Sequence, residues 1–396
     1  MRQKSNYLLN DFEKRVYFIY FCITVNCIEI TIMKRFLIVA IAAFAFVMTA
    51  TAQEKSPINY VDASTLTIIN KIHDSDKPFE RLDVEKYGSL TPRAVNAFRQ
   101  STGLALVFRT DSRNIHVRWS IHPSKLRANS PDIYLRGMDI YLKHEGKWTF
   151  AGVARPKTDP TVVEFESSLV RHMAEGEKEC MVYLPAYVHI KSLEIGVDEG
   201  SMIKAAPSPF KHKIVFIGSS LTHGEGAPRP GASYVAQLGR RLNAETPNLG
   251  HSGQCKLQQH FVDIVCDNKA DAFVFDAFSN PTADIINERL YDFVKQIRAK
   301  HKKTPLIFLQ TVRRTGAMFD LVAKKRNDDQ RAAAEKLMEK VCKEFKNVYF
   351  INNAFDTGAD NEGTVDNSHL TDYGIYRVLQ IMEPQLREIL SHHGIK

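Results

Sequence analysis

The chain has 396 residues, of which 44% are hydrophobic and 25% charged, with 53 Lys and Arg against 45 Asp and Glu. This is the balance of a globular protein of up to two or three domains, and it excludes a disordered or fibrous chain. The net charge of +8 is spread along the sequence, without a basic patch that would predict nucleic-acid binding.

The first 52 residues carry the pattern of an export signal. Met33-Lys34-Arg35 is a short basic start, residues 36–48 are apolar, and Ala50-Thr51-Ala52 is a small-residue cleavage site. We predict a signal peptide at 33–52, with 1–32 as an upstream extension from a wrongly chosen start codon; a genuine amino-terminal anchor is the alternative. The mature protein is then expected to be exported, periplasmic or extracellular, without a stable membrane span.

Residues 55–206 are rich in segments with strand periodicity. Between positions 115 and 121, apolar residues alternate with polar ones, which predicts a half-buried strand. Many short strands, without a helical stretch that has a clear apolar face, predict an antiparallel β-sandwich of jelly-roll type. The other predicted strands are Leu104–Phe108, Asp139–Lys143, Trp148–Val153, Thr161–Glu166 and Met181–Leu184.

After Pro207-Ser208-Pro209 the pattern changes, and residues 210–396 are predicted to form an α/β domain. Short continuous apolar runs predict strands buried on both faces, and helical stretches lie between them. The last helix is expected to kink or break at Pro384. The alternation predicts a parallel sheet that binds ligands at the carboxyl ends of its strands. The strands are Ile214–Ile217, Ala272–Phe275, Leu306–Leu309 and Val348–Ile351, and the helices include Tyr234–Leu242, Ile285–Ile297 and Ala332–Phe345.

Ser220 directly follows the first of these strands, where its hydroxyl can stand at the top of the sheet. A serine hydroxyl is a poor nucleophile unless a base takes its proton. His369 is the candidate base, and Asp366, three residues earlier, can hold the other imidazole nitrogen. Ser219 is the competing nucleophile. A helix-capping turn at the serines and a surface turn at Asp366 are the structural alternatives.

Acyl transfer also needs hydrogen-bond donors for the developing oxyanion. The backbone N–H groups of Ser220 and Gly253 and the side-chain amide of Asn280 are the candidates, with a loop glycine and a turn asparagine as the structural alternatives for the last two. Arg229 and His251 are candidate substrate-binding residues on the wall of the pocket.

The histidines near the predicted site, at positions 223, 251 and 260, lack close metal-ligand spacing, so we expect no metal and no cofactor. Four cysteines follow the predicted signal peptide, and none forms a C-x-x-C pair. We therefore expect them to be free thiols.

The order Ser220, Gly253, Asn280 and Asp366-x-x-His369 resembles the SGNH (GDSL) hydrolase superfamily over about residues 210–393. The resemblance implies a flavodoxin-like three-layer α/β/α domain. It also implies Ser220 as nucleophile, Gly253 and Asn280 as oxyanion donors, and Asp366 and His369 as the rest of a triad. The sequence departs from the family where G-D-S-L reads Gly218-Ser219-Ser220-Leu221 and where G-x-N-D reads Phe278-Ser279-Asn280-Pro281.

The amino-terminal half adds a second resemblance. Residues 137–141, Gly-Met-Asp-Ile-Tyr, are similar to the G-x-D-L-Y motif of a jelly-roll domain that precedes some bacterial SGNH domains. Tyr183-Leu184-Pro185 and Arg229-Pro230-Gly231 fit the same branch. Asp139 and Tyr141 are interpreted as structural residues, with substrate contact as the alternative.

These observations predict an exported serine esterase that hydrolyses small acyl esters, above all acetyl groups on carbohydrates, through an acyl-enzyme intermediate. The expected partner is a small-molecule or oligosaccharide ester, a prediction that rests on family analogy as well as on export. Two alternatives remain. One is a lipase or thioesterase of the same superfamily, and the other is a catalytically inactive carbohydrate-binding surface protein.

Overall fold

The computed structural model describes residues 14–18, 20, 23 and 57–395. The chain divides into two units, Met1–Pro57 and Ile58–Lys396, of which the second carries the fold described below. The predicted signal peptide at 33–52 lies outside the described residues, as does most of the predicted extension at 1–32. In the described part of the chain, every helix is too short or too polar to cross a bilayer.

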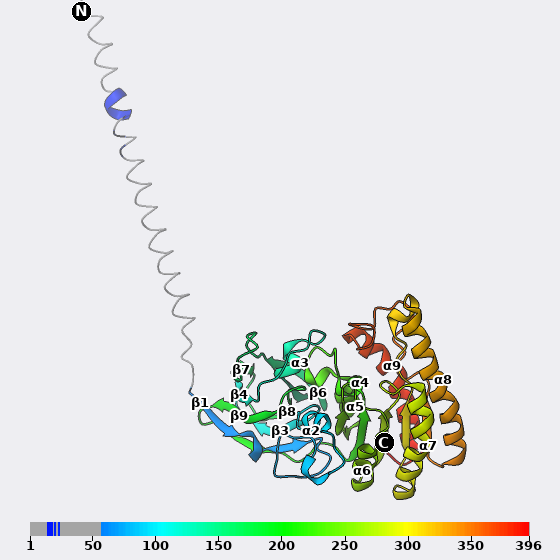
Figure 1. Ribbon diagram of the computed structural model, residues 1–396. Coiled ribbons are helices and arrows are strands. Elements are labelled where there is room, and N and C mark those ends of the chain that lie inside the picture. Colours follow the sequence, from blue (N-terminus) through cyan, green and yellow to red (C-terminus); the bar gives the residue numbers. More distant parts are fainter. Residues whose placement is uncertain (1–13, 19, 21–22, 24–56, 396) are drawn as a thin grey trace, which may run out of the picture. The chain divides into compact units, whose positions relative to one another are not determined.

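The amino-terminal half of the second unit is a sandwich of two antiparallel sheets, as predicted (Figure 1). Trp119, Phe108 and their apolar neighbours fill the space between the sheets. The first sheet has the order β1 (Ile58–Asp62), β9 (Ile190–Asp198), β4 (Ile115–Ile121) and β7 (Glu164–Val170). The second has the order β10 (Ile203–Ala205), β3 (Ala105–Thr110), β8 (Lys178–Tyr183), β5 (Met138–His144) and β6 (Lys147–Ala154), with β2 (Thr67–Ile69) paired to β3.

Short helical segments lie between these strands. They are α2 (Pro92–Phe98), α3 (Asp132–Arg136) and the 3₁₀ turns Ala63–Thr65 and Val84–Lys86. The helix α2 starts with the side chain of Thr91 accepting the N–H of Ala94, a regular amino-terminal cap. The segment that contains α2 packs into the core of the second half, because Ala94 and Phe98 share a cluster with Leu249 and Phe261.

The carboxyl-terminal half is built on a parallel sheet with the order β13, β11, β14, β15, β16, which is the flavodoxin-like order 2-1-3-4-5. The short strand β12 extends the sheet beside the start of β11. The strands are β11 (His212–Gly218), β12 (Ala244–Glu245), β13 (Asn248–Gly250), β14 (Ala272–Asp276), β15 (Leu306–Leu309) and β16 (Val348–Ile351). This confirms the predicted α/β class.

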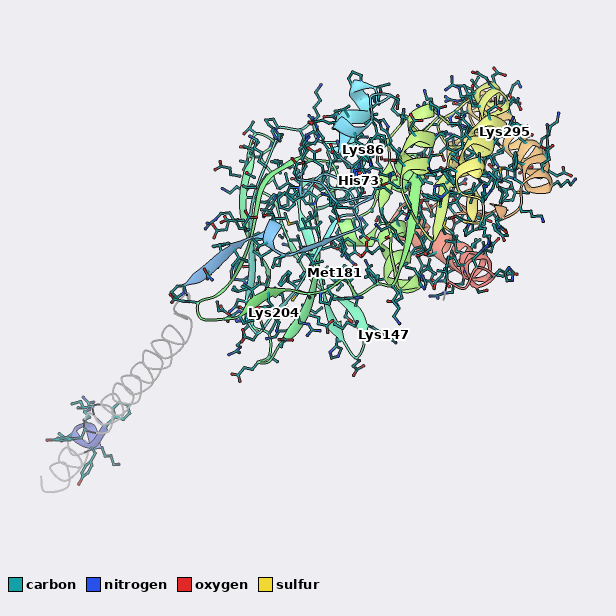
Figure 2. The ribbon with its side chains drawn as sticks, turned by 90° about the horizontal axis from the view of Figure 1, so that it is seen from below. His73, Lys86, Lys147, Met181, Lys204 and Lys295 are labelled. Carbon is teal, nitrogen blue, oxygen red and sulfur yellow. The ribbon has the colours of Figure 1, made fainter. Side chains whose placement is uncertain are left out.

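Helices cover both faces of the sheet (Figures 1 and 2). One face packs against α6 (Gln259–Asp267), α7 (Ala283–Lys300) and α8 (Leu321–Glu344). The other packs against α5 (Tyr234–Leu242) and α9 (Asp372–Ser391). Lys295, which is labelled in Figure 2, is an exposed residue of α7. The apolar runs in β11, β14 and β15 are buried on both faces, as parallel strands inside a sheet require, whereas the edge strand β16 is partly buried.

The last helix corrects part of one prediction, because α9 continues through Pro384 to Ser391 and so does not break there. Pro384 cannot donate a hydrogen bond to the carbonyl of Gln380, but both residues are exposed, so water can satisfy that carbonyl. On the opposite face Met382, Leu386 and Leu390 are buried. Packing of this face holds the helix together.

The G-x-D-L-Y-like segment joins the sandwich to the second half. Asp139 is fully buried, and its carboxylate accepts the N–H of Gly231 at 2.9 Å and pairs with Arg229 at 2.5 Å. The Tyr141 hydroxyl donates to the carbonyl of Gly231 at 3.1 Å and accepts from Arg240. These contacts agree with the structural interpretation of Asp139 and Tyr141.

Candidate active site

Ser220 lies at the point where β11 ends and the one-turn helix α4 (Ser220–His223) begins. The strand closes with Gly218, where a Cβ would stand 2.1 Å from the Thr222 hydroxyl and 2.7 Å from Asp276 Cβ. Only glycine allows so tight a turn between strand and helix here. The turn brings Ser220 to the carboxyl edge of the sheet, where its hydroxyl reaches a cavity.

His369 and Asp366 complete a hydrogen-bonded chain with Ser220. His369 Nε2 is 2.8 Å from Ser220 Oγ, and His369 Nδ1 is 2.7 Å from Asp366 Oδ2. Burial opposes the ionisation of Asp366, but hydrogen bonds from Asn129 and from His369 outweigh it and hold the pKa of Asp366 at about 2. Asp366 is therefore ionised wherever an imidazole titrates, and it fixes Nδ1–H so that Nε2 faces the serine as an acceptor.

Ser219 has a different environment from Ser220. It is fully buried, its hydroxyl donates to Asp276 Oδ2 at 2.5 Å, and it caps α4 by accepting the N–H of Leu221. A hydroxyl committed to a buried carboxylate cannot approach a substrate. The geometry thus favours Ser220 over Ser219 as the nucleophile.

Asp276, at the end of β14, is a site residue that the sequence analysis missed. Its buried carboxylate accepts from the backbone and hydroxyl of Ser219, from Thr222 and from Ser279. Burial raises the pKa of Asp276, and the hydrogen bonds from Ser219 and Ser279 oppose that rise. A charged residue at the end of an otherwise apolar strand run was the available signal, since strand ends in such sheets meet at the site.

The three predicted oxyanion donors line the same cavity. Gly253 has a φ of 71°, in the left-handed region that glycine tolerates best. The Asn280 side-chain oxygen accepts the N–H of Cys255 at 3.1 Å, which leaves its NH₂ group available as a donor. Ser220 offers a backbone N–H at the start of a helix. This arrangement can stabilise a negatively charged oxygen next to Ser220 Oγ.

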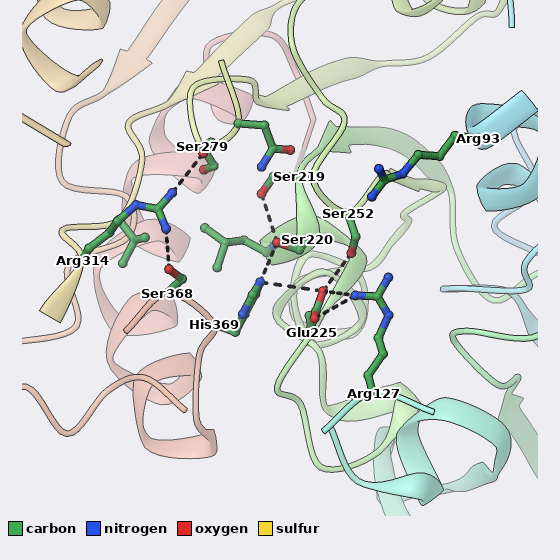
Figure 3. A pocket seen from close by; sticks show the side chains of 14 residues that line it. Arg93, Arg127, Ser219, Ser220, Glu225, Ser252, Ser279, Arg314, Ser368 and His369 are labelled. Carbon is green, nitrogen blue, oxygen red and sulfur yellow. Dashed lines mark hydrogen bonds and ion pairs between the residues drawn. The ribbon is translucent and has the colours of Figure 1, made fainter. Parts of the chain in front are cut away.

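The cavity has a volume of about 290 Å³ and is lined mainly by polar and charged side chains (Figure 3). Arg93 and Arg127 come from the sandwich half, so that half forms one wall. In Figure 3 the guanidinium groups of Arg314 and Arg93 lie on opposite sides of Ser220. The remaining lining residues are Ser219, Leu221, Glu225, Ser252, Gly253, Ser279, Asn280, Val312, Ser368 and His369.

Glu225 is the second site residue that the sequence analysis missed. Its side chain is only 5% exposed, and its Oε2 lies 3.7 Å from His369 Nε2, the imidazole nitrogen that faces Ser220. Burial alone would raise the pKa of Glu225, but the charges of His369 and Arg127 and hydrogen bonds from Asn129 and Ser252 lower it below its ordinary value. The cavity therefore holds a fixed carboxylate beside the predicted base.

Residues of the sandwich half hold Glu225 in place. Arg127 donates to both of its oxygens at 2.9 and 3.0 Å, and Tyr187 donates to Oε2 at 3.0 Å. Asn129 Nδ2 lies 2.8 Å from both Glu225 Oε1 and Asp366 Oδ2, so one amide contacts the two carboxylates that flank the imidazole. No local sequence pattern marks these residues, because Asn129 is separated from Asp366 by 237 positions.

Two predicted substrate-binding residues do not reach the cavity, which corrects that part of the sequence analysis. Arg229 is turned toward Asp139 and lies over the ring of Phe150. His251 is 2% exposed and packs against Phe98, and burial lowers its pKa to about 3, so it stays neutral. Both residues are close in sequence to residues that line the cavity, but their side chains point into packed regions of the protein and not into the cavity.

Among the described residues, no group of three or more His, Cys, Asp or Glu could hold a metal ion. His223 is buried and is stacked on Tyr187, with its Nε2 2.9 Å from the carbonyl of Ala186. His260 is also buried. The four cysteines of the described part of the chain are free thiols, at positions 180, 255, 266 and 342.

Two family models match this chain. Residues 211–387 match the GDSL-like lipase/acylhydrolase family, and residues 58–203 match the GxDLY family, the amino terminus of SGNH-hydrolase-type esterases. The first match covers the flavodoxin-like half, and the second covers the sandwich. No curated protein matched the sequence.

Solved structures give the same picture. A Bacteroides ovatus protein classed as a GDSL-like lipase is 38% identical, with a TM-score of 0.81 over 85% of this chain and 98% of that one. The salicylyl-acyltransferase SsfX3 of a tetracycline biosynthetic pathway is 21% identical, with a TM-score of 0.64 over 85% and 98%. A family two carbohydrate esterase from Cellvibrio japonicus is 12% identical, with a TM-score of 0.55 over 85% and 99%. The last two share the fold.

Proposed function

As a member of the GDSL-like lipase/acylhydrolase family, this chain is an ester hydrolase of SGNH type, and we propose that it is an exported serine esterase. Its proposed reaction is the hydrolysis of small acyl esters, above all acetyl esters of carbohydrates, through an acyl-enzyme intermediate. The hydrogen-bonded chain from Asp366 through His369 to Ser220, which ends in the cavity, is the observation that supports this proposal most. It also argues against an inactive carbohydrate-binding protein.

In the first half of the reaction, Ser220 Oγ attacks the ester carbonyl carbon while its proton passes to His369 Nε2, 2.8 Å away. The carbonyl oxygen becomes an oxyanion, which the N–H groups of Ser220 and Gly253 and the amide of Asn280 stabilise. Asp366 stabilises the imidazolium that forms. Collapse of the tetrahedral intermediate breaks the ester bond, and the imidazolium gives its proton to the departing alcohol.

In the second half, water attacks the acyl-enzyme, and His369 takes a proton from it. The second tetrahedral intermediate then releases the free acid, and the proton returns to Ser220. The same donors serve both intermediates, because the oxyanion forms at the same place.

The cavity supports a short acyl group and a polar alcohol. Its volume of about 290 Å³ is small, and only Leu221 and Val312 contribute apolar side chains. The side chain of Arg93 forms no hydrogen bond or ion pair with any other described residue, so the five N–H groups of its guanidinium are available to a ligand. Arg314 uses two N–H groups, on Ser368 and on the carbonyl of Ser279. We propose that these two arginines bind saccharide hydroxyl groups.

A lipase remains the second candidate, because an exposed apolar run follows the cavity-lining residue Arg314 closely in the sequence. Met318, Phe319, Leu321 and Val322 are 62–83% exposed, and the run begins four residues after Arg314. Exposed apolar clusters of this kind are found where proteins contact acyl chains, membranes or other proteins.

We expect acetyl esters to be hydrolysed faster than octanoyl esters, because the cavity has little apolar surface for a long chain. Rates on nitrophenyl acetate, butyrate and octanoate, with acetate release from acetylated oligosaccharides measured in parallel, test this. The Ser220→Ala variant supplies the blank for both assays. Faster hydrolysis of the octanoate, with no acetate released from any oligosaccharide, would favour the lipase.

Arg93→Ala is expected to raise KM for an acetylated oligosaccharide by about tenfold, the effect of losing a hydrogen bond from a charged donor. The effect on nitrophenyl acetate, which carries no sugar hydroxyl groups, should be smaller. Arg313→Ala is the matched control, since Arg313 is an exposed arginine outside the cavity lining. Equal changes of KM on the two substrates would contradict a role of Arg93 in binding the sugar.

A further inference from the structure

A mechanism built on Ser220, His369 and Asp366 does not use Glu225, although among the described residues Glu225 is the one carboxylate that lines the cavity. Hydrogen bonds hold both oxygens of the Glu225 carboxylate in place. Oε1 accepts from Arg127 and Asn129, and Oε2 accepts from Arg127, Tyr187 and Ser252. With its lone pairs occupied, Glu225 is not available as a proton acceptor for substrate or water. What it presents to the site is a fixed negative charge.

That charge lies next to the nitrogen that changes protonation during the reaction. Glu225 Oε2 is 3.7 Å from His369 Nε2, a contact drawn in Figure 3. Asp366 Oδ2 is 2.7 Å from His369 Nδ1, so the imidazole ring stands between two carboxylates. Each proton taken from Ser220 makes the ring positive. In a buried site, opposite charges at this distance attract strongly, and the attraction exists only while the ring is charged.

Glu225 also reaches the oxyanion loop. Ser252 Oγ lies 2.9 Å from Glu225 Oε2 and 2.7 Å from the Tyr187 hydroxyl, so the two hydroxyl groups share their two protons among the three contacts with Glu225 and with each other. Ser252 directly precedes Gly253, whose N–H is a proposed oxyanion donor. One carboxylate therefore ties together the loop of the base, the loop of the oxyanion donor and three side chains of the sandwich half.

We propose that Glu225 is a positioning residue of this esterase, which stabilises the His369 imidazolium and fixes the Ser252–Gly253 loop, and that Arg127 and Asn129 make the sandwich half part of the catalytic apparatus. The proposal rests on the proposed function, since it assumes that Ser220 and His369 carry the reaction. The charged groups that contact the imidazole or line the cavity beside it are Asp366, Glu225, Arg127, Arg93 and Arg314.

Removing either member of the Arg127–Glu225 ion pair is expected to shift the pH profile, and the two shifts should be in opposite directions. Glu225→Gln removes a negative charge that stabilises the His369 imidazolium. The neutral imidazole is then more stable relative to the imidazolium, so the acid limb of the kcat/KM profile moves to lower pH. In Arg127→Gln the carboxylate loses its compensating cation, and the acid limb moves to higher pH. We expect shifts of about half a pH unit or more, because charges at this distance interact strongly even in a partly solvated site.

The plateau value of kcat in Glu225→Gln is expected to fall about tenfold to hundredfold, with KM changed by less than about threefold, because the lost interaction belongs to the transition state. Glu339→Gln makes the same change of net charge at an exposed position on α8 and is the control. Melting temperatures of all variants report on folding. If Glu225→Gln does not fold, Arg127→Gln carries the test alone.

Loss of activity in both variants without movement of the acid limb would show a purely structural role and would overturn the proposal. Shifts in the same direction would do so as well. The Ser220→Ala variant distinguishes a failure of the proposed function from a failure of the proposed role of Glu225. An active Ser220→Ala enzyme would refute the proposed function itself, independently of the results for Glu225.

Discussion

Replacing Ser220 by Ala is expected to lower kcat/KM for nitrophenyl acetate by about 10⁴-fold or more, as the loss of a triad member does in other serine hydrolases. The hydroxyl that His369 contacts at 2.8 Å is then gone, and no other described hydroxyl is hydrogen-bonded to that nitrogen. His369→Ala should be equally severe, since nucleophile and base act as a unit. Asp366→Asn should be milder, because the nucleophile and the base both remain.

Ser219→Ala is the matched control for that variant, because it removes the neighbouring hydroxyl. It deletes the cap of α4 and one donor to Asp276, so we expect a loss of stability of about 1–2 kcal/mol and a fall in activity of less than about tenfold. Equal damage from the two substitutions in folded proteins would contradict the assignment of Ser220.

Arg81→Met should destabilise the fold by about 3–5 kcal/mol, since it leaves several buried carbonyl groups without a donor. Arg81 is 1% exposed, and its guanidinium donates to the carbonyls of Asn248 and Gly250 in β13 and of Ala97 and Gln100 beside α2. Burial lowers the pKa of Arg81 to about 9, so the group is still charged at neutral pH.

The control for Arg81→Met is Arg99→Met, a half-exposed arginine of the same segment whose contact with Glu80 is 3.7 Å long. Surface pairs of this kind contribute about 0–1 kcal/mol. Urea unfolding of both variants, followed by circular dichroism, measures the difference. A loss below about 1 kcal/mol for Arg81→Met would show that water or local rearrangement replaces the guanidinium.

The sequence predicted the parts of the fold that follow from local patterns. The apolar runs at 214–217, 272–275, 306–309 and 348–351 became β11, β14, β15 and β16, because strands buried on both faces need continuous apolar residues. The helix α6 was missed, since Gln258 provides no side-chain cap and no start signal was visible. The strand β9 was missed because a bulge opposite Ile121 interrupts its alternation.

The site was predictable only where its residues form short motifs. Ser220, Gly253, Asn280, Asp366 and His369 lie within motifs or just after strand ends, and the structure brings all five to one cavity or its edge. Asp276 carried one signal, a charged residue at the end of an apolar strand run. Glu225, Arg127 and Asn129 depend on contacts between distant segments, and their sequence surroundings carry no signal. Conversely, the position of Arg229 and His251 in loops near the motifs suggested substrate contacts that their burial and partners exclude.

The central claim, that Ser220 is the activated nucleophile of a serine esterase, is tested most directly by labelling with a serine-directed fluorophosphonate. Intact mass should show one adduct per chain, and peptide mapping should place it on Ser220, with no adduct in Ser220→Ala or His369→Ala. The adduct should also form in Ser219→Ala. A folded wild-type protein that stays unlabelled, or an adduct on Ser219 or on another residue, would contradict the account.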